Sequence, residues 1–167
     1  MTRRLLPLLL VSVALAVAGC GNKVTTVTGS NGQVTTKTTV SFAKTKFLLH
    51  AGLAFGTFHH FIYGPLKAGD FAHPLSHKAT LAKAVVAGAF IIHEVKIALT
   101  DAQSSAILSK LVSPLTALGA GLAGVVAGIK SGHVDTSKIT SSNSSISSIE
   151  STASSVGAKV NETVGAI

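Results

Sequence analysis

The sequence predicts an all-α protein built as a small bundle of three to four helices. Three observations favour this class. Apolar residues between positions 42 and 131 recur with a helical rather than an alternating period. Pro and Gly interrupt these apolar segments where helices are expected to end. The polar stretch near the C-terminus also carries an apolar stripe at alternating spacings of three and four residues.

Residues 1–20 have the layout of an export signal that ends at a cysteine. Arg3 and Arg4 precede an uncharged, mostly apolar run from Leu5 to Val17. This run is about thirteen residues long, whereas a membrane-spanning helix needs roughly twenty. It closes in the tetrapeptide Val17-Ala18-Gly19-Cys20, and Cys20 is the only cysteine of the chain. A cleaved signal therefore fits residues 1–19 better than a permanent anchor helix does.

The same tetrapeptide resembles the lipobox of bacterial lipoproteins, a resemblance that covers the first twenty residues. It implies that the thiol of Cys20 receives a diacylglyceryl group and that the signal is cut just before this residue. The mature protein would then be anchored to the extracytoplasmic face of the cell membrane through the lipid on Cys20. An ordinary signal peptide would instead leave an unpaired thiol in an oxidising compartment.

Residues 20–41 are expected to form either a β-hairpin or a flexible tether. Two runs rich in Thr and Val flank Asn31-Gly32, a pair that favours a tight type I′ turn. An isolated two-stranded hairpin is only marginally stable in water. The sequence leaves both interpretations open.

The first helix of the apolar domain, residues 42–131, is expected over Phe47 to Tyr63. This segment is apolar nearly all round, which predicts a helix that is buried or inserted into a membrane. Gly52 and Gly56 are four residues apart on one face and predict close approach of a neighbouring helix. Gly64-Pro65 is expected to end the helix, with a connecting loop over residues 66–76.

A second helix is expected from about Ser76 or His77 to Leu99, placed in the middle of the bundle. It shows two apolar stripes separated by two charged ones. The first stripe runs through Leu81 and Gly88, and the second, on the nearly opposite face, runs through Val86 and His93. The capping-box spacing of Thr100-Asp101-Ala102-Gln103 predicts that another helix starts there. A further helical pattern continues to Ile129, kinked, broken or started at Ser113-Pro114. Its Gly124 and Gly128 are expected to lie at helix contacts.

The C-terminal region is expected to consist of a Ser/Thr-rich linker, residues 132–143, and an amphipathic helical tail, residues 144–167. The predicted helix runs from about Ser144 to Val164 and carries a heptad-like apolar stripe. We expect this helix to be only marginally stable, because serine is a poor helix former. We expect the tail to dock on the bundle or on another protein, including a second copy of this chain.

Six histidines between positions 50 and 93 raise the question of a metal or haem site. Asp70, His73 and His77 have a spacing that one helical turn could bring together, although Pro74 disfavours a regular helix there. His59 or His60 facing His93 across two helices could ligate haem iron. The alternative, which we favour, is that these histidines supply polarity at helix ends and interfaces, so neither a metal nor another cofactor is expected.

Motifs for catalysis are incomplete. His93-Glu94 begins like the zinc-protease pattern H-E-x-x-H, but Ile97 stands at the position of the second histidine. The sequence contains neither a G-x-S-x-G motif nor a phosphate-binding G-x-x-x-x-G-K-[ST] motif. The sequence thus predicts a protein that is not an enzyme.

The charge balance gives little support to a nucleic-acid partner. The chain carries 14 Lys and Arg against 6 Asp and Glu, a formal net charge of +8, yet the lysines are scattered singly and tryptophan is absent. We expect a lipid-anchored envelope protein whose helical domain is structural or binds a partner. The alternatives are a haem- or metal-binding envelope protein and a small membrane-inserted helical protein.

Overall fold

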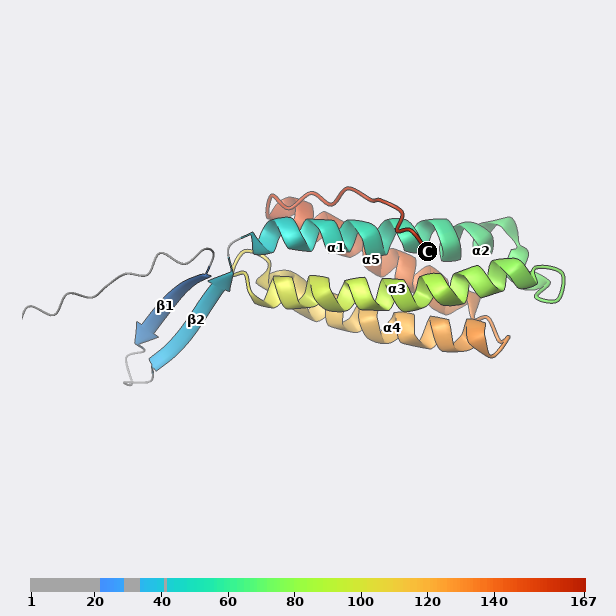
Figure 1. Ribbon diagram of the computed structural model, residues 1–167, viewed down its shortest axis with the longest axis horizontal. Coiled ribbons are helices and arrows are strands. Elements are labelled where there is room, and N and C mark those ends of the chain that lie inside the picture. The colour runs from blue at the N-terminus through green and yellow to red at the C-terminus, as the bar shows by residue number, and fades with distance from the viewer. Residues whose placement is uncertain (1–21, 29–33, 41) are drawn as a thin grey trace, which may run out of the picture.

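The computed structural model describes residues 22–28, 34–40 and 42–167, and side-chain burial for 42–167. The predicted signal peptide, Cys20 and the Asn31-Gly32 turn lie outside the described residues. Two strands, β1 (Asn22–Thr28) and β2 (Val34–Val40), pair antiparallel with Asn22 opposite Val40 and Thr28 opposite Val34. In Figure 1 this pair extends beyond the end of the bundle at which α1 begins.

The prediction of an all-α bundle is confirmed for the rest of the described chain. Four long helices run alongside one another (Figure 1), namely α1 (Ala43–Phe58), α3 (Lys78–Gln103), α4 (Val112–Lys130) and α5 (Thr136–Ser155). Helix α3 packs most extensively against α1 and α4, and α4 in turn packs against α5. This places α3 between two neighbours, as the sequence predicts.

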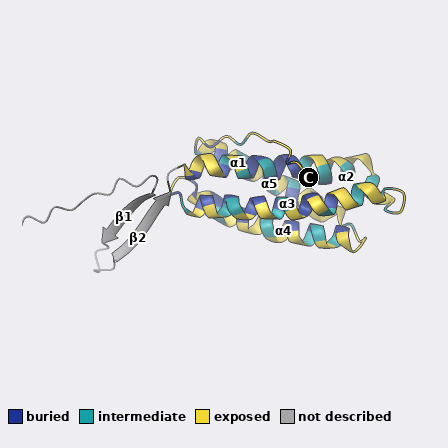
Figure 2. Ribbon diagram, in the orientation of Figure 1, coloured by how far each residue is buried: buried dark blue, intermediate teal, exposed yellow. Residues whose placement is uncertain are grey.

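The bundle core is aliphatic and aromatic, and it faces inward from every long helix (Figure 2). Its largest members include side chains from all four long helices. Helix α1 contributes phenylalanines, whereas α4 contributes leucines at spacings of three and four. The fully buried side chains on these two helices include Phe47, Phe55, Phe58, Leu115, Leu118 and Leu122.

The first helix does not end at Gly64-Pro65, contrary to prediction. It passes through a π-helical turn, η1 (His59–Tyr63), and continues as the short helix α2 (Gly64–Ala68). The amide of Gly64 donates to the carbonyl of His59, five residues earlier. A proline ring in a regular α-helix would clash with the carbonyl four residues before it, and the wider π-turn relieves that crowding. A 3₁₀ turn, η2 (Asp70–Ala72), follows in the connection.

The predicted helix start at Thr100 is wrong, because α3 continues without a break to Gln103. The Thr100 hydroxyl donates to the carbonyl of Lys96, 3.1 Å away, and therefore does not cap a new helix. After a short loop, the 3₁₀ turn η3 (Ser109–Leu111) leads into α4, whose first residue is Val112. Pro114 lies in the first turn of α4, where its missing amide hydrogen costs no helical bond.

The two-stripe interpretation of α3 also needs correction. Its buried residues form one broad face of small and aliphatic side chains, and two carboxylates, Glu94 and Asp101, lie at the edge of that face. Two residues of the second predicted stripe, Val86 and His93, are exposed instead. The small side chains on this face, the alanines and Gly88, let the neighbouring helices pack close to α3. Glu94 and Asp101, at the edge of the face, are therefore buried as well.

The linker predicted over residues 132–143 is largely helical. Asp135 caps α5 by accepting a hydrogen bond from the Lys138 amide at 3.1 Å, and this helix begins at Thr136. It ends at Ser155, about nine residues before the predicted end at Val164. The apolar stripe itself is real and extends further toward the N-terminus than predicted, with Ile139, Ile146, Ile149 and Ala153 all buried. The remaining residues to Ile167 are not helical.

Candidate functional site

The C-terminal segment, residues 156–167, lies along α1 on the face that carries Gly52 and Gly56. Figure 1 shows it running back over α1 after α5 ends. The amide of Thr163 donates to the carbonyl of Gly52 at 3.0 Å. The amide of Gly165 donates to the buried hydroxyl of Thr57 at 2.9 Å. The predicted close approach is present, but its partner is an extended segment and not a helix.

Both glycines leave room for main-chain atoms of this segment. A methyl group at Gly52 would collide with the carbonyl oxygen of Asn161, and one at Gly56 would collide with the backbone of Thr163. The other two predicted packing glycines differ. Gly128 lies under the carbonyl of His133 in the turn after α4, whereas a methyl group at Gly124 would make only ordinary contact with Lys138.

His59 joins three elements at the edge of the C-terminal segment. Its Nδ1 lies 2.7 and 2.8 Å from the two carboxylate oxygens of Glu162. Its Nε2 lies 2.8 Å from Oδ1 of Asn143 on α5. The ring edge also packs against Tyr63 one turn later. This histidine therefore connects η1, directly after α1, with α5 and with the C-terminal segment.

Glu150 on α5 belongs to the same group of residues. Burial raises the pKa of this carboxyl, the charge and hydrogen bonding of Glu162 raise it further, and His59 opposes the shift. We call His59, Asn143, Glu150 and Glu162 the His59 cluster. Sequence reasoning noted His59 but missed its partners, because they lie between 84 and 103 residues away along the chain.

A second polar cluster lies between α1 and α3. Nδ1 of His50 is 2.6 Å from Oε2 of Glu94. Nearby Asp101 has a buried oxygen, Oδ2, that has no hydrogen-bond partner among the residues that the structure describes. Burial raises the pKa of Asp101, and the charges of His50 and Lys46 oppose this rise. The cluster places ionisable groups inside the bundle, where the carboxylate of Glu94 lies within hydrogen-bond distance of the His50 ring.

The other candidate histidines are not brought together. His60 and His93 are both exposed, so the geometry needed for haem ligation by His60 and His93 across packed helices is not formed. Nδ1 of His77 lies 3.7 Å from Asp70, while His73 is exposed. Within the described ranges, no three side chains of His, Cys, Asp or Glu are arranged to hold a metal ion.

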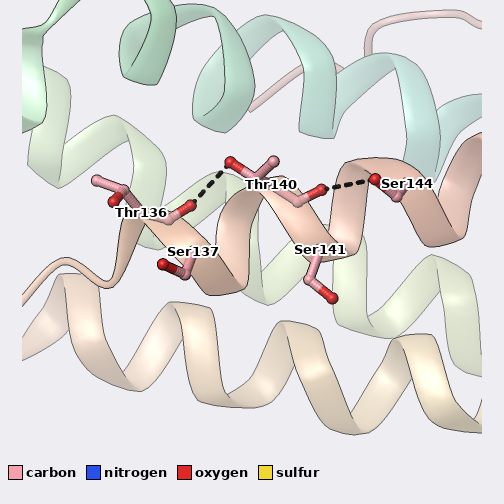
Figure 3. Close-up of a pocket in the computed structure, with 5 residues that line it drawn as sticks. All are labelled: Thr136, Ser137, Thr140, Ser141 and Ser144. Carbon is pink, nitrogen blue, oxygen red and sulfur yellow. Dashed lines mark hydrogen bonds between the residues drawn. The ribbon is translucent and has the colours of Figure 1, made fainter.

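The outer surface of α5 carries a shallow, open depression lined entirely by hydroxyl side chains. Figure 3 shows its five residues, Thr136, Ser137, Thr140, Ser141 and Ser144. The hydroxyls of Thr140 and Ser144 donate to carbonyls four residues earlier, so they serve the helix itself. This depression offers neither a charged group nor an activated nucleophile for chemistry.

One helical stretch in the described part of the chain, Ser109–Lys130, is long and apolar enough to cross a membrane. It has 22 residues and a mean hydropathy of 1.7, and 28% of its most apolar window is buried in the bundle. Composition and length alone give weak support for a membrane span, because core helices of soluble proteins share them.

Comparison with known proteins finds none that is similar to this chain. No protein family's sequence model matches this chain, and neither a curated protein nor a solved structure is significantly similar to it.

Proposed function

We propose that this protein is a lipid-anchored protein of the bacterial cell envelope, whose helical bundle acts without catalysis by binding a partner. The observation that carries the proposal is the tetrapeptide Val17-Ala18-Gly19-Cys20 behind a short apolar run with two arginines before it. Two acyl chains on Cys20 would bind a membrane stably, whereas a single chain binds reversibly.

The described bundle uses two of its histidines to hold the fold together. His50 pairs with Glu94 and His59 pairs with Glu162, so both imidazoles join separate parts of the fold. Such pairs act as structural ties between helices and the C-terminal segment. A rigid bundle held beside a membrane presents its outer faces to other molecules of the envelope.

Replacement of Cys20 tests the anchor. We expect Cys20→Ala to abolish acylation and to leave the protein as an unprocessed precursor or free of the membrane. Mass spectrometry of the wild-type N-terminus should find a diacylglyceryl group on Cys20, and membrane fractionation should separate the two proteins. An unmodified Cys20, or a mature N-terminus elsewhere, contradicts the proposal. Circular dichroism of both proteins serves as the control for folding.

A second candidate, a membrane-inserted helical protein, is favoured by one observation, the apolar stretch Ser109–Lys130. A chain that begins at residue 21, and therefore carries neither the apolar signal nor Cys20, distinguishes the two. A tethered bundle without its lipid stays in the aqueous phase after extraction with sodium carbonate. An inserted bundle stays with the membrane until detergent is added.

A further inference from the structure

Three segments of the chain meet at the end of the bundle where α1 begins. Helices α3 and α5 both end there, as Figure 1 shows, and the turn η3 after α3 contacts α5. A methyl group added to Gly157, after α5, would lie 3.6 Å from Nζ of Lys44 on α1. The strand β2 ends at Val40, two residues before Phe42, so we call this the tether end. The three segments are residues 42–46, 103–111 and 154–159.

The tether end is a basic surface. None of its three segments contains Asp or Glu, and the nearest acid along the chain, Asp101, is buried between α1 and α3. The opposite end carries mixed charges, because its lysines are accompanied by Asp70 and Asp135. The tether end therefore attracts a negatively charged partner. Its lysines are all exposed, namely Lys44, Lys46, Lys110 and Lys159.

Two large apolar side chains are exposed among these lysines. Phe42 is 76% exposed and Ile107 is 58% exposed. Phe42 also has a φ of +66°, and within the described residues it is the one residue other than glycine with a positive φ. This conformation is costly for a bulky residue, and a ring so exposed gains little packing to offset the cost. An aromatic residue held in this way indicates a role in binding rather than in stability.

Lysines surrounding exposed apolar side chains are suited to a lipid surface. The ammonium groups bind the phosphates of anionic headgroups, while aromatic and aliphatic side chains enter the boundary between headgroups and acyl chains. A soluble polyanion would neutralise the lysines but would leave Phe42 and Ile107 in water, where their apolar area gains nothing. The combination of charge and apolar surface therefore favours an anionic bilayer over a soluble polyanion.

We propose that the tether end is a docking surface for an anionic phospholipid bilayer, with its lysines at the headgroups and with Phe42 and Ile107 inserted between them. The hairpin that leads from Cys20 joins the bundle at this same end, so the anchor and the docking surface face the same membrane. The choice of a membrane rests on the proposed lipid anchor, whereas the contact itself belongs to residues 42–167. Docking in this way leaves the opposite end of the bundle free to meet other molecules of the envelope.

Tryptophan reporters test the insertion of Phe42. The chain from residue 21 onward, without signal or Cys20, is mixed with vesicles of phosphatidylcholine and phosphatidylglycerol in equal amounts. The chain has no tryptophan, so Phe42→Trp places a single one at the tether end. Leu75→Trp, at a position 84% exposed at the opposite end, is the matched control. We expect the emission of the first variant alone to shift to shorter wavelength when vesicles are added. A shift at position 75 only, or binding without a shift at position 42, would overturn the proposal, and the second result would favour a soluble polyanion.

Charge reversal tests the lysines. Lys110→Glu with Lys159→Glu changes the tether end, whereas Lys78→Glu with Lys130→Glu changes the net charge equally at the opposite end. Each lysine beside an anionic leaflet raises the partition coefficient about fivefold, so we expect the first pair to lower vesicle binding by more than about tenfold. The second pair should lower it by less than about threefold, because the 26 residues of α3 place the two ends about 39 Å apart, several Debye lengths. Vesicle sedimentation measures binding, and circular dichroism checks that each variant is folded. Equal losses in the two pairs would contradict docking by the tether end.

Lipid composition and salt complete the test. Binding should be weak on vesicles of phosphatidylcholine alone and should fall as salt is raised, because salt screens the attraction between lysines and headgroups. Equal binding to both kinds of vesicle, or binding that withstands high salt, would refute docking and favour insertion of the apolar stretch Ser109–Lys130. These measurements use a chain without Cys20, so a negative result leaves the proposed anchor standing. Conversely, the absence of lipid on Cys20 in mass spectrometry refutes the anchor and leaves the vesicle result unchanged.

Discussion

Gly56 is one of the two glycines of α1, with Gly52, that lie directly against the backbone of the C-terminal segment. A methyl group at this position would collide with main-chain atoms of Thr163, which cannot move without displacing the strand-like segment. In a typical mid-helix position, replacement of glycine by alanine is favourable by up to about 1 kcal/mol. At Gly56 the collision opposes that gain.

We therefore expect Gly56→Ala to lower the free energy of unfolding by about 1–3 kcal/mol, the usual cost of overpacking. Chemical denaturation measures this change. Gly124→Ala is the matched control, because its methyl group would come no closer than 3.9 Å to a neighbour, the Cδ of Lys138. The control should be neutral or slightly more stable. Equal stability of Gly56→Ala and Gly124→Ala would contradict the observed packing of the segment.

The buried environment of Asp101 predicts how the stability of the protein depends on pH. Burial raises its pKa from the ordinary 3.8, with the charges of His50 and Lys46 opposing the rise. Its Oδ2 atom has no hydrogen-bond partner within the described part of the chain. The protonated acid is thus favoured in the folded state. The protonated carboxyl of Asp101 therefore contributes to the stability of the fold below the ordinary pKa. This contribution is lost as the pH rises through the raised pKa.

We expect Asp101→Asn to be more stable than the wild type at pH 7, and the difference to shrink as the pH approaches 4. Thermal denaturation at several pH values measures both. The amide removes the buried charge while keeping the shape of the side chain. A difference that grows toward low pH would show that the ionised carboxylate stabilises the fold instead.

At the scale of elements, α5 shows how packing overrides a poor helix-forming sequence. Most of its side chains are Ser or Thr, which lower helix propensity, and many of their hydroxyls donate to carbonyls of the preceding turn. The buried stripe of Ile139, Ile146 and Ile149 compensates by packing against the bundle. The helix exists because of its tertiary contacts.

This view predicts opposite effects on the two faces of α5. Replacing the exposed Ser148 and Ser151 together by alanine should raise the free energy of unfolding by about 0.5–1 kcal/mol, because alanine is the better helix former. Ile146→Ala should lower it by about 2–5 kcal/mol, since it leaves a cavity in the core. Urea denaturation checks both values. If the variant with alanine at both positions is less stable than the wild type, the exposed serine hydroxyls stabilise the fold by more than serine's lower helix propensity costs.

At the scale of the molecule, the hydrophobic core joins the helices to one another and to the C-terminal segment. Among residues 42–167 it extends from Phe47 on α1 to Ala158 and includes residues from all four long helices. The strands β1 and β2 pair with each other, and the principal contacts of the bundle are those among its helices. The helical part therefore has a hydrophobic core of its own, as an independently folding domain requires.

We expect a chain lacking residues 1–41 to fold with the helical content and cooperative unfolding of the parent bundle. Circular dichroism and thermal denaturation provide the comparison, with the Cys20→Ala protein as the reference. The physical reason is that the deletion removes none of the buried side chains in the described core. A non-cooperative transition in the shortened chain would show that the N-terminal region contributes to folding.

Local sequence patterns determined the fold class and much of the element order. The apolar period over α1, α3 and α4, and the stripe along α5, are properties of short segments, since they depend on which residues lie three or four apart. The lipobox-like tetrapeptide at Cys20 is equally local. It lies outside the described residues, and the anchor stays a prediction.

Tertiary structure decided the ends of elements and the identity of contacts. Gly64-Pro65 is a strong stop signal by itself, yet the helix crosses it through a π-turn. The Ser/Thr composition near Thr136 indicates a linker, yet burial of an isoleucine stripe makes it helical. The close approach at Gly52 was predictable, but its partner could not be, because the glycine pair specifies only that a backbone fits there. The pairing of His59 with Glu162 joins residues 103 apart, and such a contact depends on how the helices pack rather than on any local pattern.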